Sequence, residues 1–198
     1  MLQRENQKTG AKPSVRVARA LGVTFFVVLA AVSFAYASTE WDSSRGLAMA
    51  RFSGWVAVGG LALGLCVTPL SRIPRLRALS AWRRAIGIAT AFASTVHVAL
   101  SLFGPLDGAW QAVLTWPYLA AGALAFAVLS LLFFTSFPRI VRALRIGHWK
   151  VLHRLVYAAA LFVVAHLMLS PWGSVTIKAA VSGGLVLLVL SRARSAAS

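Results

Sequence analysis

The chain has 198 residues, of which 59% are hydrophobic and 12% charged, with a mean hydropathy of +0.78. A soluble domain is about one quarter charged, so this composition excludes an ordinary soluble enzyme and indicates a membrane protein. The 20 Lys and Arg exceed the 4 Asp and Glu, which leaves a formal net charge of +16. These basic residues lie between long apolar runs, so we expect them to face the anionic lipid bilayer and no nucleic acid.

Six apolar runs are long enough to cross a bilayer, which takes about 20 helical residues. In chain order they are 20–37, 52–70, 85–103, a run within 110–137, 151–169 and 175–191. We expect the fourth to begin near Pro117, because proline suits a first helical turn. Helices satisfy their backbone polar groups internally in lipid. The sequence therefore predicts an all-α integral membrane protein, a six-transmembrane-helix bundle over residues 20–191 with tails at 1–19 and 192–198.

Basic residues are divided unequally between the two sides of this predicted bundle. Residues 1–19, 71–84, 138–154 and 192–198 hold 17 of the 20 Lys and Arg. Connections rich in Lys and Arg stay in the cytoplasm, so both termini are predicted to be cytoplasmic. The remaining three, Arg45, Arg51 and Lys178, are predicted on the outer side.

Residues 1–37 have a second interpretation, as a secretory signal peptide. A basic region and an apolar core precede Ala35-Tyr36-Ala37, which resembles a signal-peptidase site. Cleavage would leave five spans with unchanged orientation. The apolar run is long for a signal peptide, so we favour a retained first span.

Histidines are the main ionisable residues inside the predicted spans, which contain no Asp or Glu. Polar side chains at membrane depth are costly and suggest function. His97 lies 12 residues after position 85 and His166 lies 15 after position 151, or roughly 18 and 22 Å from the cytoplasmic ends of their helices. Two imidazoles at matched depth can ligate one haem iron axially. The alternative is that each simply bonds a carbonyl of a neighbouring helix.

His153 precedes His166 by 13 residues, or about 20 Å toward the cytoplasm. It is a candidate ligand for a second haem near the inner surface, or else an interfacial residue beside Arg154. A straight helix turns by about 220° over this interval. Either the helix departs from ideal geometry, or the two histidines use different sides of it.

Around these histidines the chain resembles the ferric-reductase-like transmembrane proteins. The stretches that carry the resemblance are VTPLSR (67–72), WRRAIG (82–87), TVH (95–97), WPYL (116–119), FTS (134–136) and GHWKVLHRLVY (147–157), followed by His166. The resemblance covers about residues 46–190. It is nearest to a branch of that family, the haem-binding membrane subunits of bacterial periplasmic methionine sulfoxide reductase systems.

This resemblance implies a b-type cytochrome in the bacterial inner membrane that carries electrons to a periplasmic molybdopterin-containing reductase. The donor would be quinol or a cytoplasmic flavin reductase, and the family is also credited with a flavin mononucleotide (FMN) site. On this reading His97 and His166 ligate haem b, and His153 is a further haem-linked histidine. The chain would be an electron-transfer subunit and not a complete enzyme.

One position departs from the wider family, whose third span carries two histidines. The residue 14 positions before His97 is Arg83, and a guanidinium is a poor iron ligand because it stays protonated. Arg83 is instead predicted, with the adjacent Arg84, to bind a haem propionate or a flavin phosphate; plain cytoplasmic anchoring is the alternative. The haem count therefore stays at one or two.

Two other functions stay open at this point. One is a stand-alone transmembrane reductase for ferric or other metal ions, or for quinones. The other is a non-redox membrane interaction or transport protein. The lack of intramembrane carboxylates argues against transport.

Overall fold

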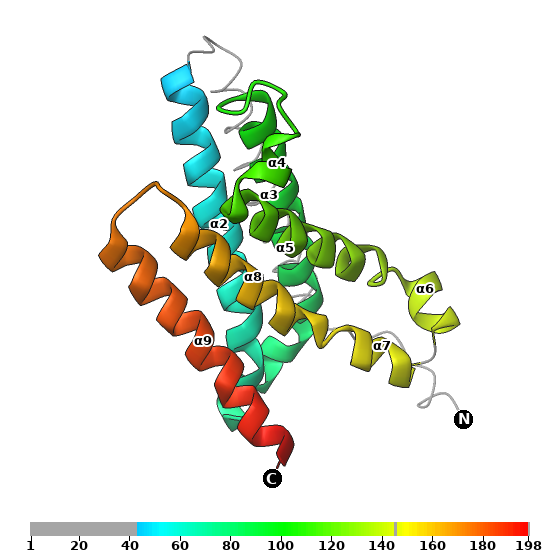
Figure 1. Cartoon of the computed structure of the whole chain (residues 1–198). Helices are drawn as coiled ribbons and strands as arrows, with labels where there is room; N and C mark the ends of the chain where they lie inside the picture. Colours follow the sequence, from blue (N-terminus) through cyan, green and yellow to red (C-terminus); the bar gives the residue numbers. More distant parts are fainter. Residues whose placement is uncertain (1–42, 145, 198) are drawn as a thin grey trace, which may run out of the picture.

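A computed structural model describes residues 43–144 and 146–197 (Figure 1). The elements are α2 (Ser43–Leu70), the 3-10 helix η2 (Pro74–Trp82), α3 (Arg83–Phe103), α4 (Ala112–Thr115), α5 (Pro117–Phe134), α6 (Pro138–Ala143), α7 (Ile146–Leu152), α8 (Leu155–Leu169) and α9 (Val175–Ala197). Within these residues every regular element is helical. The predicted first span, the tail before it and the alternative cleavage site all lie outside the described residues.

Four helical segments are long and apolar enough to cross a membrane: Arg45–Leu70, Pro74–Phe103, Pro117–Phe134 and Gly147–Leu169. A shorter apolar helix covers Val175–Ser191. Large apolar side chains on these helices stand exposed, among them Phe52, Phe92 and Leu161, as expected for surfaces that face lipid. An all-helical integral membrane protein is thus confirmed, whereas the total of six spans and the cytoplasmic termini stay predictions.

Prolines set the beginnings of several helices. Pro117 is the first residue of α5, after an extended Trp116, which confirms the predicted start of the fourth run. Proline is favoured there because its missing N–H needs no partner in a first turn. Gly108 and Gly173 have positive φ values of 75° and 85° in the connections after α3 and α8, where a residue without Cβ avoids strain.

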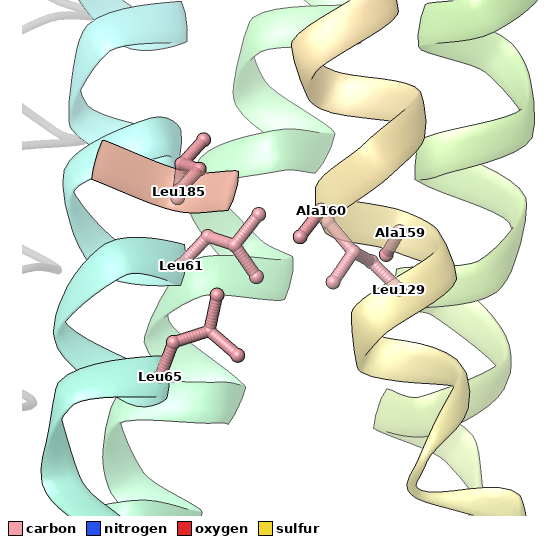
Figure 2. Packing of buried hydrophobic residues seen from close by; sticks show 6 residues of the cluster. All are labelled: Leu61, Leu65, Leu129, Ala159, Ala160 and Leu185. Atoms are coloured by element: carbon pink, nitrogen blue, oxygen red, sulfur yellow. The ribbon is translucent and has the colours of Figure 1, made fainter. Parts of the chain in front are cut away.

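The helices form two closely packed pairs, α2 with α3 and α5 with α8, and α9 packs against α8 and α2. At the first pair a Cβ added to Gly60 would lie only 2.6 Å from Thr90 Oγ1. Small residues of this kind let membrane helices approach one another. Figure 2 shows the buried apolar cluster between the pairs, which consists of Leu61, Leu65, Leu129, Ala159, Ala160 and Leu185.

The helix that carries His153 and His166 is interrupted between α7 and α8. α7 ends at Leu152 and α8 begins at Leu155. Across the junction the amides of Arg154, Val156 and Tyr157 each bond the carbonyl three residues earlier, which is 3-10 geometry. His153 therefore lies at a departure from ideal helix geometry, and the rotation of a straight helix does not relate it to His166.

Candidate functional site

The structure brings His97 of α3 and His166 of α8 together, two residues that the sequence predicts at similar depth. Their ring centroids are 6.2 Å apart and the ring planes make an angle of 77°. Both side chains are half-buried. One histidine comes from each of the two helix pairs, so the two imidazoles meet at the junction between the pairs.

His97 is oriented by a backbone carbonyl of the facing helix α2. Its Nδ1 lies 2.8 Å from the carbonyl oxygen of Ala50, and the Ser53 hydroxyl lies 3.5 Å from the same nitrogen. Four residues after Ala50 comes Gly54, where an added Cβ would lie 3.0 Å from His97 Cε1. The missing side chain at Gly54 thus lets the imidazole reach the carbonyl one turn earlier.

His166 repeats this arrangement on the second helix pair. Its Nδ1 lies 2.7 Å from the carbonyl oxygen of Tyr118 in α5. Four residues later is Gly122, where an added Cβ would lie 2.7 Å from the same Nδ1. The Tyr118 ring also lies beside His166, with centroids 5.9 Å apart. Each helix pair thus supplies one histidine, one carbonyl and one glycine in the same relationship.

These contacts determine the tautomer of both imidazoles. A carbonyl oxygen only accepts hydrogen bonds, so Nδ1 of each histidine must carry the proton. In a neutral imidazole Nε2 then holds a free lone pair, which is the arrangement of histidines whose second nitrogen binds a metal. Among the described residues neither Nε2 has a hydrogen-bond partner. The predicted alternative, a bond to a neighbouring carbonyl, is therefore present but occupies only one nitrogen of each ring.

The separation of the rings fits a shared iron. A metal–imidazole bond is about 2 Å long and joins a nitrogen about 1 Å from its ring centre, so two imidazoles on opposite sides of one metal ion have centroids about 6 Å apart. The observed separation is 6.2 Å. No group of three or more His, Cys, Asp or Glu among the described residues could hold a bare metal ion. Two axial nitrogens suit an iron whose other four ligands belong to a macrocycle.

His153 has different surroundings, beyond the last residue of α5 and before the first residue of α8. Its ring stacks on Trp149, with centroids 4.0 Å apart. Its Nδ1 lies 3.2 Å from the Trp149 carbonyl oxygen, and its Nε2 lies 3.3 Å from the Ser136 hydroxyl. Trp149 Nε1 in turn donates to the Thr135 carbonyl. Both imidazole nitrogens of His153 are thus engaged by groups of the chain.

Arg83 and Arg84 stand exposed in the first turn of α3. The Arg83 guanidinium donates to the hydroxyl of Thr68, in the last turn of α2. Arg83 and His153, both predicted at the cytoplasmic side, thus have different polar partners in the structure.

The sequence did not predict Ala50, Gly54, Tyr118 and Gly122 as parts of the site. A backbone carbonyl can come from any residue type, so nothing in the sequence marks Ala50 or Tyr118 as an acceptor, although Tyr118 belongs to the WPYL stretch (116–119). The glycines offered a weak signal, because each is a small residue at the depth of a histidine. Without knowledge of which helices are neighbours, that signal could not be assigned.

The fold and the paired histidines define an all-helical membrane protein in which two helix pairs present one imidazole each. Over residues 53–164 the chain matches the ferric reductase like transmembrane component, and it belongs to that family. The matched range contains His97 and His153 and ends just before His166.

Relatives of similar sequence are haem-binding subunits MsrQ of protein-methionine-sulfoxide reductase. The chain is 31% identical to the one from Azospira oryzae over 164 residues, which is 78% of this chain and 70% of the relative. It is 34% identical to that of Caulobacter vibrioides over 54% of this chain and 52% of the relative. For Deinococcus radiodurans the identity is 32%, over 58% of each chain. The resemblance to this branch is thus confirmed, although most of these alignments cover little more than half of the relative.

Proposed function

We propose that this chain binds one haem b between His97 and His166 and carries electrons across a membrane. The single observation that carries the proposal is the pair of imidazoles. Their ring centroids are 6.2 Å apart, and each Nδ1 donates a hydrogen bond to a backbone carbonyl. That arrangement leaves two Nε2 lone pairs that would hold the iron of a bound haem. The names of the relatives, which are haem-binding subunits, support the same ligand.

The residues of the chain would hold the haem without a covalent bond. Attachment of a c-type haem uses two cysteines in one motif, and the sequence has the single Cys66. Bound haem supplies a one-electron ferric/ferrous couple. Ala50 and Tyr118 hold the imidazoles in one tautomer, and hydrogen bonds of this kind make the ligating nitrogen more basic. Because Gly54 and Gly122 have no side chain, each imidazole can approach its carbonyl.

The direction of electron transfer follows from the predicted orientation. The basic connections would face the cytoplasm of a bacterium, and six spans of the inner membrane would place both termini there. His97 and His166 then lie toward the outer side. His153, with Arg83 and Arg84 at the cytoplasmic side, would receive electrons there through a second haem or FMN.

The partners are proposed from the relatives and from the side on which each residue lies. The acceptor would be a periplasmic molybdopterin-containing reductase that repairs oxidised methionine, in line with the name methionine-sulfoxide reductase carried by the relatives. The donor would be the quinone pool or a cytoplasmic flavin reductase. In this role the chain is an electron-transfer subunit.

Visible spectra of the purified protein test the central proposal. We expect a reduced b-type α-band that disappears in the double variant His97→Ala and His166→Ala. His148→Ala is the matched control, because His148 is exposed on α7, and its spectrum should equal that of the wild type. A wild-type protein without the band, or a band that survives the loss of both histidines, contradicts the proposal.

A further inference from the structure

Lys178 is a buried basic side chain near the beginning of α9. Only 6% of it is exposed, and its ammonium donates to the carbonyl of Ser170, 2.7 Å away. A lysine near the end of a membrane helix normally extends its charge to the water. Lys178 instead directs its ammonium to the carbonyl of Ser170, which ends α8. Since an ammonium has three N–H donors and Ser170 takes one, two remain for another acceptor.

Ser182 adds a second donor on the same face of α9, one turn further along. Its side chain is 5% exposed, and its Oγ is buried with no hydrogen-bond partner among the described residues. Leu185 continues this face into the apolar cluster (Figure 2). Spacings of four and three residues place Lys178, Ser182 and Leu185 on one stripe of the helix. A buried hydroxyl without a partner costs free energy, so it suggests an acceptor supplied by a ligand.

These two side chains lie next to the helices that form the histidine site. α9 packs against α8, which carries His166, and against α2, which carries Ala50 and Gly54 (Figure 1). The Ser170 carbonyl that receives the Lys178 ammonium belongs to the residue that ends α8, and the Ser170 amide bonds the His166 carbonyl. Lys178 is thus held one helical turn beyond His166, on the predicted outer side.

The chemistry of these donors selects an anionic oxygen ligand. Asp107 is the one acidic residue in the part of the chain that the structure describes, and it forms no ion pair with Lys178. A carboxylate accepts several hydrogen bonds and neutralises a buried ammonium, which is costly to leave unpaired. Haem b carries two propionate carboxylates at one edge.

We propose that Lys178 and Ser182 bind a propionate carboxylate of the haem held by His97 and His166. This inference rests on the proposed function, because it needs haem at that site. On this proposal the beginning of α9 would be part of the haem-binding site, and Lys178 and Ser182 would hold the carboxylate there. The competing explanation is that Lys178 only caps the carbonyl end of α8, where a cation is favoured.

Esterified haem separates the two explanations. Protein purified without haem is loaded with haem b or with its dimethyl ester, which has no carboxylates, and the rate of haem transfer to excess apomyoglobin is measured. A charge-assisted hydrogen bond is worth enough to slow release about ten-fold or more. We expect wild-type protein to release haem b at least about ten-fold more slowly than the ester.

Lys178→Met should release haem b about as fast as the ester and leave ester release unchanged. Ser182→Ala should reduce the difference between the two haems by a smaller factor. Lys150→Met is the matched control, because it removes an exposed lysine from α7, and it should keep the wild-type difference. If Lys178→Met accelerates both haems equally, or neither, Lys178 is a helix cap and the inference is wrong.

The spectrum recorded before each transfer distinguishes this failure from failure of the proposed function. A low-spin haem spectrum that depends on both His97 and His166 supports the proposed function whatever Lys178 does. A wild-type protein that takes up neither haem contradicts both proposals.

Discussion

The imidazole of His97 stands nearly edge-on to that of His166, with ring planes at 77° and centroids 6.2 Å apart. Each ring donates a hydrogen bond to a different backbone carbonyl. His97 donates to Ala50, and His166 donates to Tyr118. Because the two carbonyls belong to different helices, the angle between the rings is a property of the helix packing. The angle should therefore persist when the two imidazoles bind an iron.

We expect a nearly perpendicular pair of axial imidazoles in the ferric protein. Perpendicular rings leave two iron d orbitals almost equal in energy, which gives a highly anisotropic low-spin signal in electron paramagnetic resonance. Parallel rings would give an ordinary rhombic signal. A rhombic spectrum from frozen wild-type protein would show that the 77° arrangement is not the ligating one.

The glycines beside the histidines should be required for haem binding. Gly54→Ala and Gly122→Ala would place a Cβ 3.0 Å from His97 Cε1 and 2.7 Å from His166 Nδ1. Disturbing the group that orients a metal-binding histidine costs about 10–100-fold in metal affinity. We expect a loss in this range by haem titration, larger for Gly122→Ala because its contact is closer.

Gly59→Ala is the control for these variants. It changes the same residue type in α2, at a position with nothing within 4 Å of the added Cβ. Alanine is the better helix former, by up to about 1 kcal/mol, so we expect unchanged haem affinity and equal or higher stability. Equal haem affinity in all three variants would show that the glycines do not orient the histidines.

A side chain added at Gly60, where α2 packs closely against α3, should lower the stability of the protein. In Gly60→Ala the new Cβ would lie 2.6 Å from Thr90 Oγ1, and overpacking of this kind costs about 1–3 kcal/mol. Thermal unfolding in detergent should show the loss. Combining it with Thr90→Ala, which removes the contacted hydroxyl, should recover part of the stability. Purely additive effects of the two changes would contradict a direct contact.

Replacing His153 should slow electron entry at the predicted cytoplasmic side and leave haem binding by His97 and His166 unchanged. It stacks on Trp149 and contacts Ser136, and neither group touches His97 or His166 in the structure. We expect His153→Ala to keep the spectrum of the outer haem while reduction by a quinol or flavin donor becomes slower in stopped-flow measurements. Loss of the outer haem signal in His153→Ala would show that the two sites are not separate.

The role of Arg83 can be tested with variants of Arg83 and of Thr68, whose hydroxyl accepts a hydrogen bond from the guanidinium. If Arg83 binds a haem propionate or flavin phosphate, Arg83→Gln weakens uptake of the inner cofactor, because a charge-assisted contact is lost, by about ten-fold or more. Thr68→Val removes only the hydroxyl that the guanidinium contacts and should have a smaller effect. Equal cofactor content in wild type and Arg83→Gln, measured by haem and flavin quantification, would leave anchoring as the role of Arg83.

Much of the fold could be predicted because its signals are local. Apolar runs of sufficient length identify membrane helices from composition alone, and Pro117 indicates a helix start by its own geometry. The described helices follow the predicted runs. The break at His153 was not predictable in this way, because neither proline nor glycine occurs at the junction (152–155) to mark it. The sequence left two alternatives open, a helix that departs from ideal geometry or two histidines on different sides of it.

The sequence by itself determined that this is a helical membrane protein, and it predicted that His97 and His166 lie at similar depth. A helix rises by a constant length per residue, so depth can be counted along the chain. Only the tertiary structure decided which nitrogen of each histidine is free, since the acceptors are backbone carbonyls of other helices. The same holds for the buried Lys178 and Ser182, whose surroundings exist only after α9 packs against α8 and α2. Hydrophobicity and helix geometry act within one segment, whereas hydrogen bonds between helices depend on which helices become neighbours.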